Sequence, residues 1–235
     1  MSELNSFLQE FKQLANPAKN KMMQRFFKTE KGQYGHGDVF LGITVPLQRK
    51  LAKKYSGLSL FDLQKLLKSK VHEHRLTALI ILVRQFQKAS QVEKEQIFKF
   101  YLANAKRINN WDLVDSSAPQ IVGRYLLDKN KSILYLLAKS ENLWEKRIAI
   151  LSTQAFIRAG KFEDTFKIAK ILMADNHDLI HKAVGWMIRE VGNKSLVAEE
   201  KFLKRNYKKF HRTALRYAIE KFPEVRRKKY LSGKI

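Results

Sequence analysis

Five stretches of the sequence carry a cation or a tryptophan at a nearly regular spacing. Arg75, Trp111 and Arg147 are 36 residues apart, and Lys182 and Arg212 follow after 35 and 30 residues. Four residues after Trp111, Lys182 and Arg212, the sequence has a carboxylate, a second tryptophan and a further arginine: Asp115, Trp186 and Arg216. Residues i and i+4 share one face of a helix, so all of these side chains are predicted to form one stripe. Such a stripe is suited to holding a polyanion and to stabilising a developing positive charge.

Asp115 is the one carboxylate of this stripe. A lone carboxylate repels a polyanionic ligand unless it has a specific task, so one interpretation is that Asp115 takes part in chemistry. The alternative is a structural ion pair with Arg147 or Lys182. Asp112 is on a different part of the helix and is expected to act at the helix N-terminus.

Aromatic and histidine residues allow two interpretations each. Trp111 and Trp186 can stack on or pack against sugars and bases, or they can belong to the core. For Trp144 we expect core packing. His177 and His181 have the i,i+4 spacing of a metal pair but lack a third ligand, so we expect a solvated pair and predict no metal site.

The repeat also predicts the elements that position these residues. Two and three residues after each landmark, the side chains are apolar or small, as expected of packing positions: Thr77, Ala78, Leu113, Val114, Ala149, Ile150, Val184, Gly185, Ala214 and Leu215. A period in the thirties, with one amphipathic helix per unit preceded by a second, is typical of HEAT or armadillo arrays. We therefore predict an all-α fold, a HEAT-like helical repeat solenoid (α-α superhelix) with a concave basic face.

Hydrophobic periodicity places helices along nearly the whole chain. The expected ranges are approximately 2–14, 17–28, 46–55, 59–69, 72–88, 90–105, 111–128, 131–139, 143–159, 162–174, 177–191, 195–207, 210–221 and 223–230. An irregular loop at about 29–45, with four glycines, is expected beside the array. No strand pattern is found.

Composition limits the class of protein. A length of 235 residues suits a single domain over 1–235, and 46 Lys and Arg against 22 Asp and Glu give a net charge of +24. Such an excess attracts polyanions, with nucleic acid as the leading candidate. The absence of cysteine excludes disulfides, thiol catalysis and cysteine-based zinc sites. Without a signal peptide or a membrane span, a cytoplasmic location is expected.

Four segments resemble one family in order and spacing. N-W-D-L-V-D at 110–115, N-L-W-E-K-R at 142–147, K-A-V-G-W-M-I-R-E at 182–190 and the glycine-containing segment at 35–46 are similar to those of the AlkD-like DNA alkylation repair glycosylases. The resemblance implies an array curved around duplex DNA that removes N3- or N7-alkylated purines without flipping the base, unlike most glycosylases.

The resemblance also implies roles for individual residues. Trp111 and Trp186 match aromatics that pack on the deoxyribose, Asp115 the catalytic carboxylate, and Arg147 a cation at the DNA backbone. Asn110 departs from the pattern, since an aromatic can precede the tryptophan in this family. Some members with this fold have lost glycosylase activity.

The chemistry of the stripe agrees with this assignment. Glycosidases ordinarily use one carboxyl group to protonate the leaving group and another to stabilise the sugar. A purine alkylated at N3 or N7 is already cationic, so one carboxylate near C1′ suffices, and aromatic faces favour the cationic sugar. We predict a monofunctional DNA glycosylase, monomeric, nucleoid-associated and without cofactor, whose DNA-binding cations are Arg75, Arg147, Lys182, Arg189, Arg212 and Arg216.

Two other classes of function remain open at this point. One is a non-catalytic HEAT-like module that binds branched or damaged DNA through the same basic face. The other is a protein-binding adaptor or an RNA binder; the net charge of +24 argues against the adaptor.

Overall fold

The structure, a computed structural model, describes residues 2–235, and every regular element in this range is helical. The α-helices are α1 (Glu3–Gln13), α2 (Pro17–Phe26), α3 (Val45–Lys54), α4 (Leu60–Leu67), α5 (His72–Lys88), α6 (Gln91–Ala103), α7 (Trp111–Ser117), α8 (Arg124–Leu126), α9 (Ser132–Ala138), α10 (Leu143–Arg158), α11 (Glu163–Leu172), α12 (Asp178–Lys194), α13 (Leu196–Asn206), α14 (Arg212–Ala218) and α15 (Glu224–Leu231). Within the described range, extended pairing is limited to an isolated bridge between Val39 and Val71. The predicted all-α class is confirmed. None of these helices is long and apolar enough to cross a membrane.

Most helix bounds lie within a few residues of the predicted ones, and the range 111–128 is the main difference. It consists of α7, a π-helical turn η2 (Pro119–Gly123) and α8. Pro119 has no N–H to donate, and the Gly123 N–H reaches back to the Ala118 carbonyl at 3.0 Å. A Cβ at Gly123 would lie 2.2 Å from the Ser152 carbonyl oxygen, so a side chain there would push α10 away.

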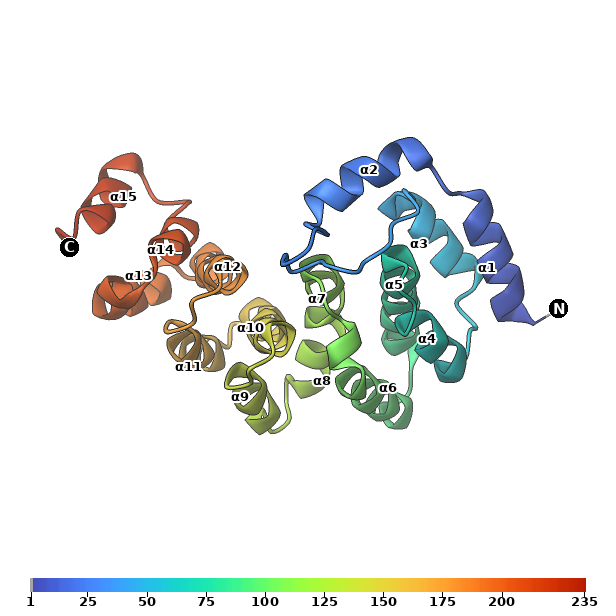
Figure 1. Ribbon diagram of the computed structural model, residues 1–235. Coiled ribbons are helices and arrows are strands. Elements are labelled where there is room, and N and C mark those ends of the chain that lie inside the picture. Colours follow the sequence, from blue (N-terminus) through green and yellow to red (C-terminus); the bar gives the residue numbers. More distant parts are fainter. Residues whose placement is uncertain (1) are drawn as a thin grey trace. The chain divides into compact units, whose positions relative to one another are not determined.

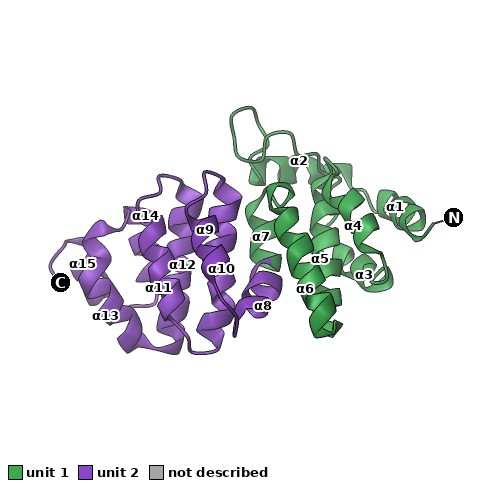
Figure 2. Ribbon diagram, turned by 90° about the horizontal axis from the view of Figure 1, so that it is seen from below, with its two compact units in different colours: residues 1–117 green, residues 118–235 purple. Residues whose placement is uncertain are grey.

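The chain divides into two compact units, residues 1–117 and 118–235 (Figure 2). In the first unit, α3, α5 and α7 lie in a row, and α4 and α6 pack against α5 (Figure 1). In the second, η2, α10, α12 and α14 form one row, and α9, α11 and α13 pack behind α10 and α12. Each unit is therefore a two-layer stack of helices, as expected of a helical repeat. A single domain over 1–235 stays a prediction.

The packing positions predicted from the repeat are buried in both units, which confirms the register. They are Thr77, Ala78, Leu113, Val114, Ala149, Ile150, Val184, Gly185, Ala214 and Leu215. At Gly185, an added Cβ would lie 2.3 Å from the Ala214 carbonyl oxygen and 2.5 Å from the Tyr217 Cβ. Glycine is thus what allows α12 and α14 to approach so closely.

Candidate active site on α7

Helix α7 places two residues of the stripe at the surface of the first unit. Asn110 is buried and precedes the helix. Its Oδ1 accepts a hydrogen bond from the Trp111 N–H at 2.8 Å, and its carbonyl accepts one from the Val114 N–H at 3.2 Å. Trp111 and Asp115 are both partly exposed and lie about one helical turn apart. Asn110 therefore serves the backbone of α7, which accounts for an amide at this position.

Trp111 is supported by a column of aromatic rings. Its ring stacks on Phe27 with a centroid distance of 5.4 Å and an interplanar angle of 17°, and Phe27 stacks on Phe40 at 5.0 Å and 18°. Phe26 meets Trp111 edge-on at 5.7 Å and is 63% exposed, whereas Phe40 is buried. The column therefore runs from the core to the surface and ends on Trp111.

A buried ion network lies beneath this column. The His72 Nδ1 is 3.0 Å from Asp38 Oδ2, and its Nε2 is 2.8 Å from Asp112 Oδ2. Arg75 completes the network with its Nη2 at 2.7 Å from Asp38 Oδ1, and its Nη1 donates to the Ser69 carbonyl at 2.9 Å. Asp112 thus binds His72, a role that its position in the first turn of α7 did not predict.

The network places Arg75 away from the surface. Its residue exposure is only 3%, and Asp38 and the Ser69 carbonyl engage its guanidinium. Burial alone raises the pKa of the Asp38 carboxyl, but the hydrogen bond from His72 and the charge of Arg75 outweigh it, and the pKa is lowered. Arg75 therefore supports the loop that carries Asp38, and its predicted contact with DNA, like that of Arg147, stays a prediction.

The loop before α3 is attached to α5 by a second carboxylate. Glu73 is buried, and its Oε1 accepts hydrogen bonds from the backbone N–H groups of Leu41 at 2.9 Å, Gly42 at 2.8 Å and Ile43 at 3.3 Å, while Oε2 also accepts from Leu41 at 3.1 Å. Gly42 has a φ of +80°, and a Cβ there would lie 2.1 Å from the Asn16 carbonyl oxygen. Glycine adopts such a positive φ without a steric penalty. The loop is therefore held tightly against α5, and Phe40 with it.

The second unit holds the other tryptophan of the stripe. Trp186 on α12 is partly exposed, and its Nε1–H donates to Glu190 Oε1 at 2.9 Å on the same helix. Arg147 on α10 is 4% exposed, and its Nη1 donates to the Leu179 carbonyl at 2.6 Å. Its predicted contact with a DNA backbone stays a prediction. Trp144 is buried, which confirms its predicted core packing.

The remaining predicted DNA-binding cations differ in their partners. The Lys182 Nζ is 2.6 Å from Asp178 Oδ2, and Arg189 forms an ion pair with Glu220. Arg212 is exposed and donates to the Leu231 carbonyl, while Arg216 is exposed on the same helix, α14. Arg212 and Arg216 are therefore accessible to a polyanion in the second unit.

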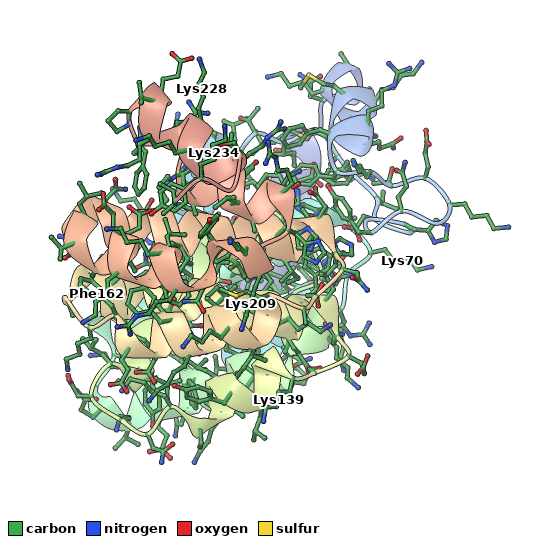
Figure 3. The ribbon with its side chains drawn as sticks, turned by 90° about the vertical axis from the view of Figure 1, so that its left-hand side faces the viewer. Lys70, Lys139, Phe162, Lys209, Lys228 and Lys234 are labelled. Atoms are coloured by element: carbon green, nitrogen blue, oxygen red, sulfur yellow. The ribbon has the colours of Figure 1, made fainter. Side chains whose placement is uncertain are left out.

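The second unit carries further exposed lysines. Figure 3 labels four of them, Lys139, Lys209, Lys228 and Lys234. The range 201–235 alone contains thirteen Lys and Arg against two Glu, a net of 13 − 2 = +11. This end of the chain carries a strong positive charge.

The histidines of α12 are placed differently from the expected solvated pair. His177 is exposed and caps the helix by accepting from the Leu179 N–H at 3.1 Å. His181 is 9% exposed, hydrogen-bonds the Asp175 carbonyl at 2.6 Å and stacks on His211 with a centroid distance of 4.0 Å. In residues 2–235, no group of three His, Asp or Glu could hold a metal ion.

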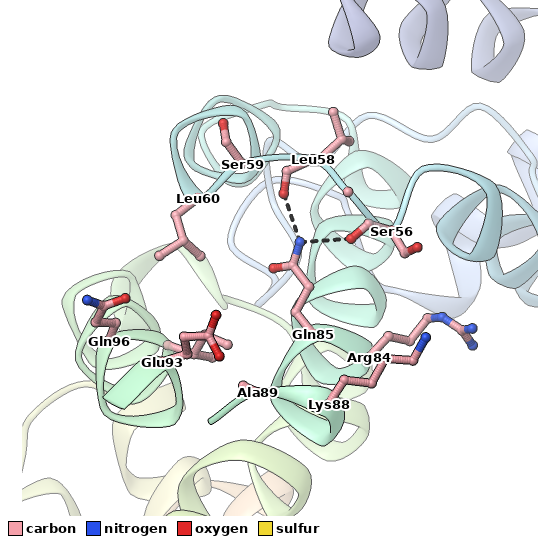
Figure 4. A pocket seen from close by; sticks show the side chains of 12 residues that line it. Ser56, Leu58, Ser59, Leu60, Arg84, Gln85, Lys88, Ala89, Glu93 and Gln96 are labelled. Atoms are coloured by element: carbon pink, nitrogen blue, oxygen red, sulfur yellow. Dashed lines mark hydrogen bonds between the residues drawn. The ribbon is translucent and has the colours of Figure 1, made fainter. Parts of the chain in front are cut away.

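A cavity of about 440 Å³ lies at the other end of α5 (Figure 4). Arg84, Gln85 and Lys88 line it, and Gln85 Nε2 donates to the carbonyls of Ser56 at 3.0 Å and Leu58 at 2.8 Å. Almost the full length of α5, several helical turns, separates these residues from His72 at its start. No residue of the stripe lines this cavity, and we do not place the chemistry there.

The two-layer stack of helices in each unit defines a helical repeat protein. Its α7 site presents Trp111 and Asp115, and the chain carries a large excess of cations. The chain belongs to the family of DNA alkylation repair enzymes, whose family model matches residues 7–222. Among solved structures, it is similar to a protein from Enterococcus faecalis described as a predicted DNA alkylation repair enzyme, with 19% sequence identity over 89% of this chain and 97% of that one and a TM-score of 0.70. That likeness shows a shared fold. A search of curated proteins found no match.

Proposed function

We propose that the protein is a monofunctional DNA glycosylase that removes N3- or N7-alkylated purines from duplex DNA without base flipping and leaves an abasic site. The observation that carries this proposal is the pairing of Trp111 and Asp115 on α7. Both are partly exposed, and Trp111 is backed by the stacked ring of Phe27. Family membership supports an enzyme of DNA alkylation repair.

The chemistry requires little from the protein. Breaking the N-glycosidic bond moves its electron pair to the purine and leaves an oxocarbenium-like sugar. The alkylated purine carries a positive charge beforehand, so it leaves as a neutral base without a protein acid. The Asp115 carboxylate stabilises the cationic sugar and positions the attacking water, and the face of Trp111 favours the same charge. Unmodified purines, which are poor leaving groups, are spared.

For two residues of the second unit, we propose roles from their resemblance to the family. Trp186 packs on deoxyribose, and Arg147 binds a phosphate. The exposed arginines Arg212 and Arg216 add affinity that does not depend on sequence, because phosphate contacts position a duplex without reading its bases. Lys182 and Arg189 contribute to the same positive field.

Release of free base from alkylated DNA tests the proposal. The protein is incubated with duplex DNA that contains 7-methylguanine, and the released base and the abasic site are quantified. Asp115→Asn is expected to abolish release above background while duplex binding is retained. The matched control is Asp128→Asn, because Asp128 is an exposed aspartate of the second unit, paired with Lys161 and not on α7, and its loss should leave the rate unchanged.

The same experiment decides between the proposal and a non-catalytic module. The net charge of +24 is sufficient for tight, salt-sensitive duplex binding without chemistry. Binding without base release, equal in the native protein and in Asp115→Asn, favours the non-catalytic module. Competition by RNA equal to that by duplex DNA contradicts a DNA repair role.

A further inference from the structure

We propose that His72 is a positioning residue for α7: its imidazolium ties the loop at Asp38 to the first turn of α7 at Asp112 and thereby fixes the orientation of Trp111. The link itself is a property of the free protein. Its consequence for catalysis rests on the proposed glycosylase function, so the two can be tested separately.

The geometry requires a charged ring. The His72 Nδ1 faces Asp38 Oδ2 at 3.0 Å and Nε2 faces Asp112 Oδ2 at 2.8 Å. An ionised carboxylate can only accept hydrogen bonds, whereas a neutral imidazole carries one N–H. Both contacts are hydrogen bonds only when both ring nitrogens are protonated. The His72 side chain is 2% exposed, so water does not compete for these bonds.

The electrostatics agree with this assignment. The charged groups that face His72 among the described residues are Asp38 from the loop, Asp112 from α7 and Arg75 from its own helix. Burial alone lowers the pKa of His72, but the charge and hydrogen bond of Asp112 and the hydrogen bond of Asp38 outweigh burial and Arg75, and the pKa is raised to about 9. The folded-state pKa lies above the ordinary value, so this contribution to stability is complete below about pH 6.5 and is lost as the pH rises through about 9.

His72 reaches Trp111 by two routes. Asp112 is the next residue after Trp111, so its bond to His72 holds the first turn of α7. The imidazolium also packs against Phe40 at 4.6 Å and 20° and against Phe27 at 4.8 Å and 37°, and Phe27 in turn stacks on Trp111. A cation over aromatic faces is attracted to them. Loss of the charge is therefore expected to loosen both the helix start and the aromatic column.

His74 offers a matched control on the same helix. It lies two residues further along, where its ring packs edge-on against Phe11 at 4.8 Å and its Nδ1 is 3.0 Å from Ser69 Oγ. Burial, helped by the charge of Arg75, lowers the pKa of His74 to about 4. A neutral histidine and a charged one thus share α5, and only His72 is bonded to α7.

The first test uses the free protein and needs no substrate. Nuclear magnetic resonance of the ring nitrogens, assigned with His72→Gln, is expected to show His72 protonated on both nitrogens at pH 7.5, with a midpoint near pH 9. The chain has three tryptophans, so the indole N–H of Trp111 can be assigned with Trp111→Phe. Its resonance should shift with the same midpoint as His72, and Asp112→Asn should move both midpoints to lower pH.

The second test measures the single-turnover rate of base release and the duplex Kd over the same pH range. The rate should fall above about pH 9 in the native protein and from a lower pH in Asp112→Asn. His72→Gln should slow release by up to about 100-fold, the effect of a displacement of roughly 1 Å at a reacting group, with the Kd within about twofold. His74→Gln should keep the native pH profile.

The outcomes separate the inference from the proposed function. A His72 midpoint near the ordinary value, or a Trp111 resonance that does not follow His72, overturns the positioning role even if base is released. An unchanged pH profile in Asp112→Asn also overturns it. Linked titrations without any base release support the positioning of Trp111 and contradict only the glycosylase function.

Discussion

Replacing Glu73 tests how the loop before α3 is held. Its buried carboxylate accepts from the backbone N–H groups of Leu41, Gly42 and Ile43 and thereby fixes the segment that carries Phe40. Glu73→Ala removes every one of these acceptors, whereas Glu73→Gln keeps one oxygen and replaces the other with a donor. The two variants therefore form a graded series at one position.

The expected magnitude follows from the number of donors that lose a partner. A buried N–H without an acceptor costs about 1–3 kcal/mol. Leu41 is partly exposed, so water can replace the carboxylate there, and the cost falls mainly on the buried Gly42 and Ile43. Glu73→Ala should destabilise the loop by about 2–6 kcal/mol, since two donors each lose about 1–3 kcal/mol, and Glu73→Gln by about 1–2 kcal/mol.

Amide hydrogen exchange at Leu41, Gly42 and Ile43 measures this effect locally. Each step of about 1.4 kcal/mol corresponds to a factor of ten, so protection in Glu73→Ala should fall by about 30-fold at the lower bound and about 20,000-fold at the upper bound. The control is Glu95→Ala, which removes an exposed i,i+4 pair with Lys99. Such a pair contributes at most about 0.5 kcal/mol. Protection in Glu73→Ala within threefold of the native protein would refute the reasoning, because the loop would then be held by other contacts.

Three further predictions concern the second unit and its contacts. Burial, with a smaller contribution from Glu200, raises the pKa of Glu199 to about 8. The native state therefore loses stability as the pH rises from about 4.5 to 8. Glu199→Gln should raise the melting temperature at pH 8.5 and leave it nearly unchanged at pH 4. Gly185→Ala should destabilise the α12–α14 contact by about 1–3 kcal/mol in urea unfolding. Gly57→Ala, whose nearest neighbour would be 3.5 Å from the new Cβ, is the control and should have a much smaller effect. For binding to duplex DNA, Arg216→Ala should reduce the slope of the logarithm of the association constant against the logarithm of the salt concentration by about 0.9. Lys167→Ala, on α11, is the control and should leave this slope unchanged. Equal slopes in both variants contradict the contact of α14 with DNA.

The sequence predicts the helical stack well because burial repeats along it. The pairs two and three residues after each landmark, such as Leu113 with Val114 and Ala149 with Ile150, are buried as expected. Periodicity reports which side chains share a helix face, and it succeeds where that face packs against the next helix of the row. The hydrophobic periodicity does not predict the π-helical turn at Pro119, because the helical pattern continues through it.

The same periodicity does not predict the ion network of Asp38, His72, Arg75 and Asp112. Asp38 and Asp112 reach His72 from 34 and 40 residues away, through a loop and a different helix. Arg75 belongs to the cationic stripe by spacing, yet a carboxylate from the loop covers it. Spacing cannot reveal what covers a face. The sequence did contain one signal: His72 lies about one helical turn before Arg75. Two ionisable groups therefore share the start of α5, beside the only long loop that the sequence predicts.

Comparison of base release by the native protein and by Asp115→Asn is the most direct test of the central claim. Both proteins are given duplex DNA containing 7-methylguanine at the same protein excess, with duplex binding measured in parallel. We expect the native protein to release free 7-methylguanine and leave an abasic site, Asp115→Asn to release none above background, and both proteins to bind the duplex. Equal release by the two proteins, or none by either despite tight binding, would contradict the central claim.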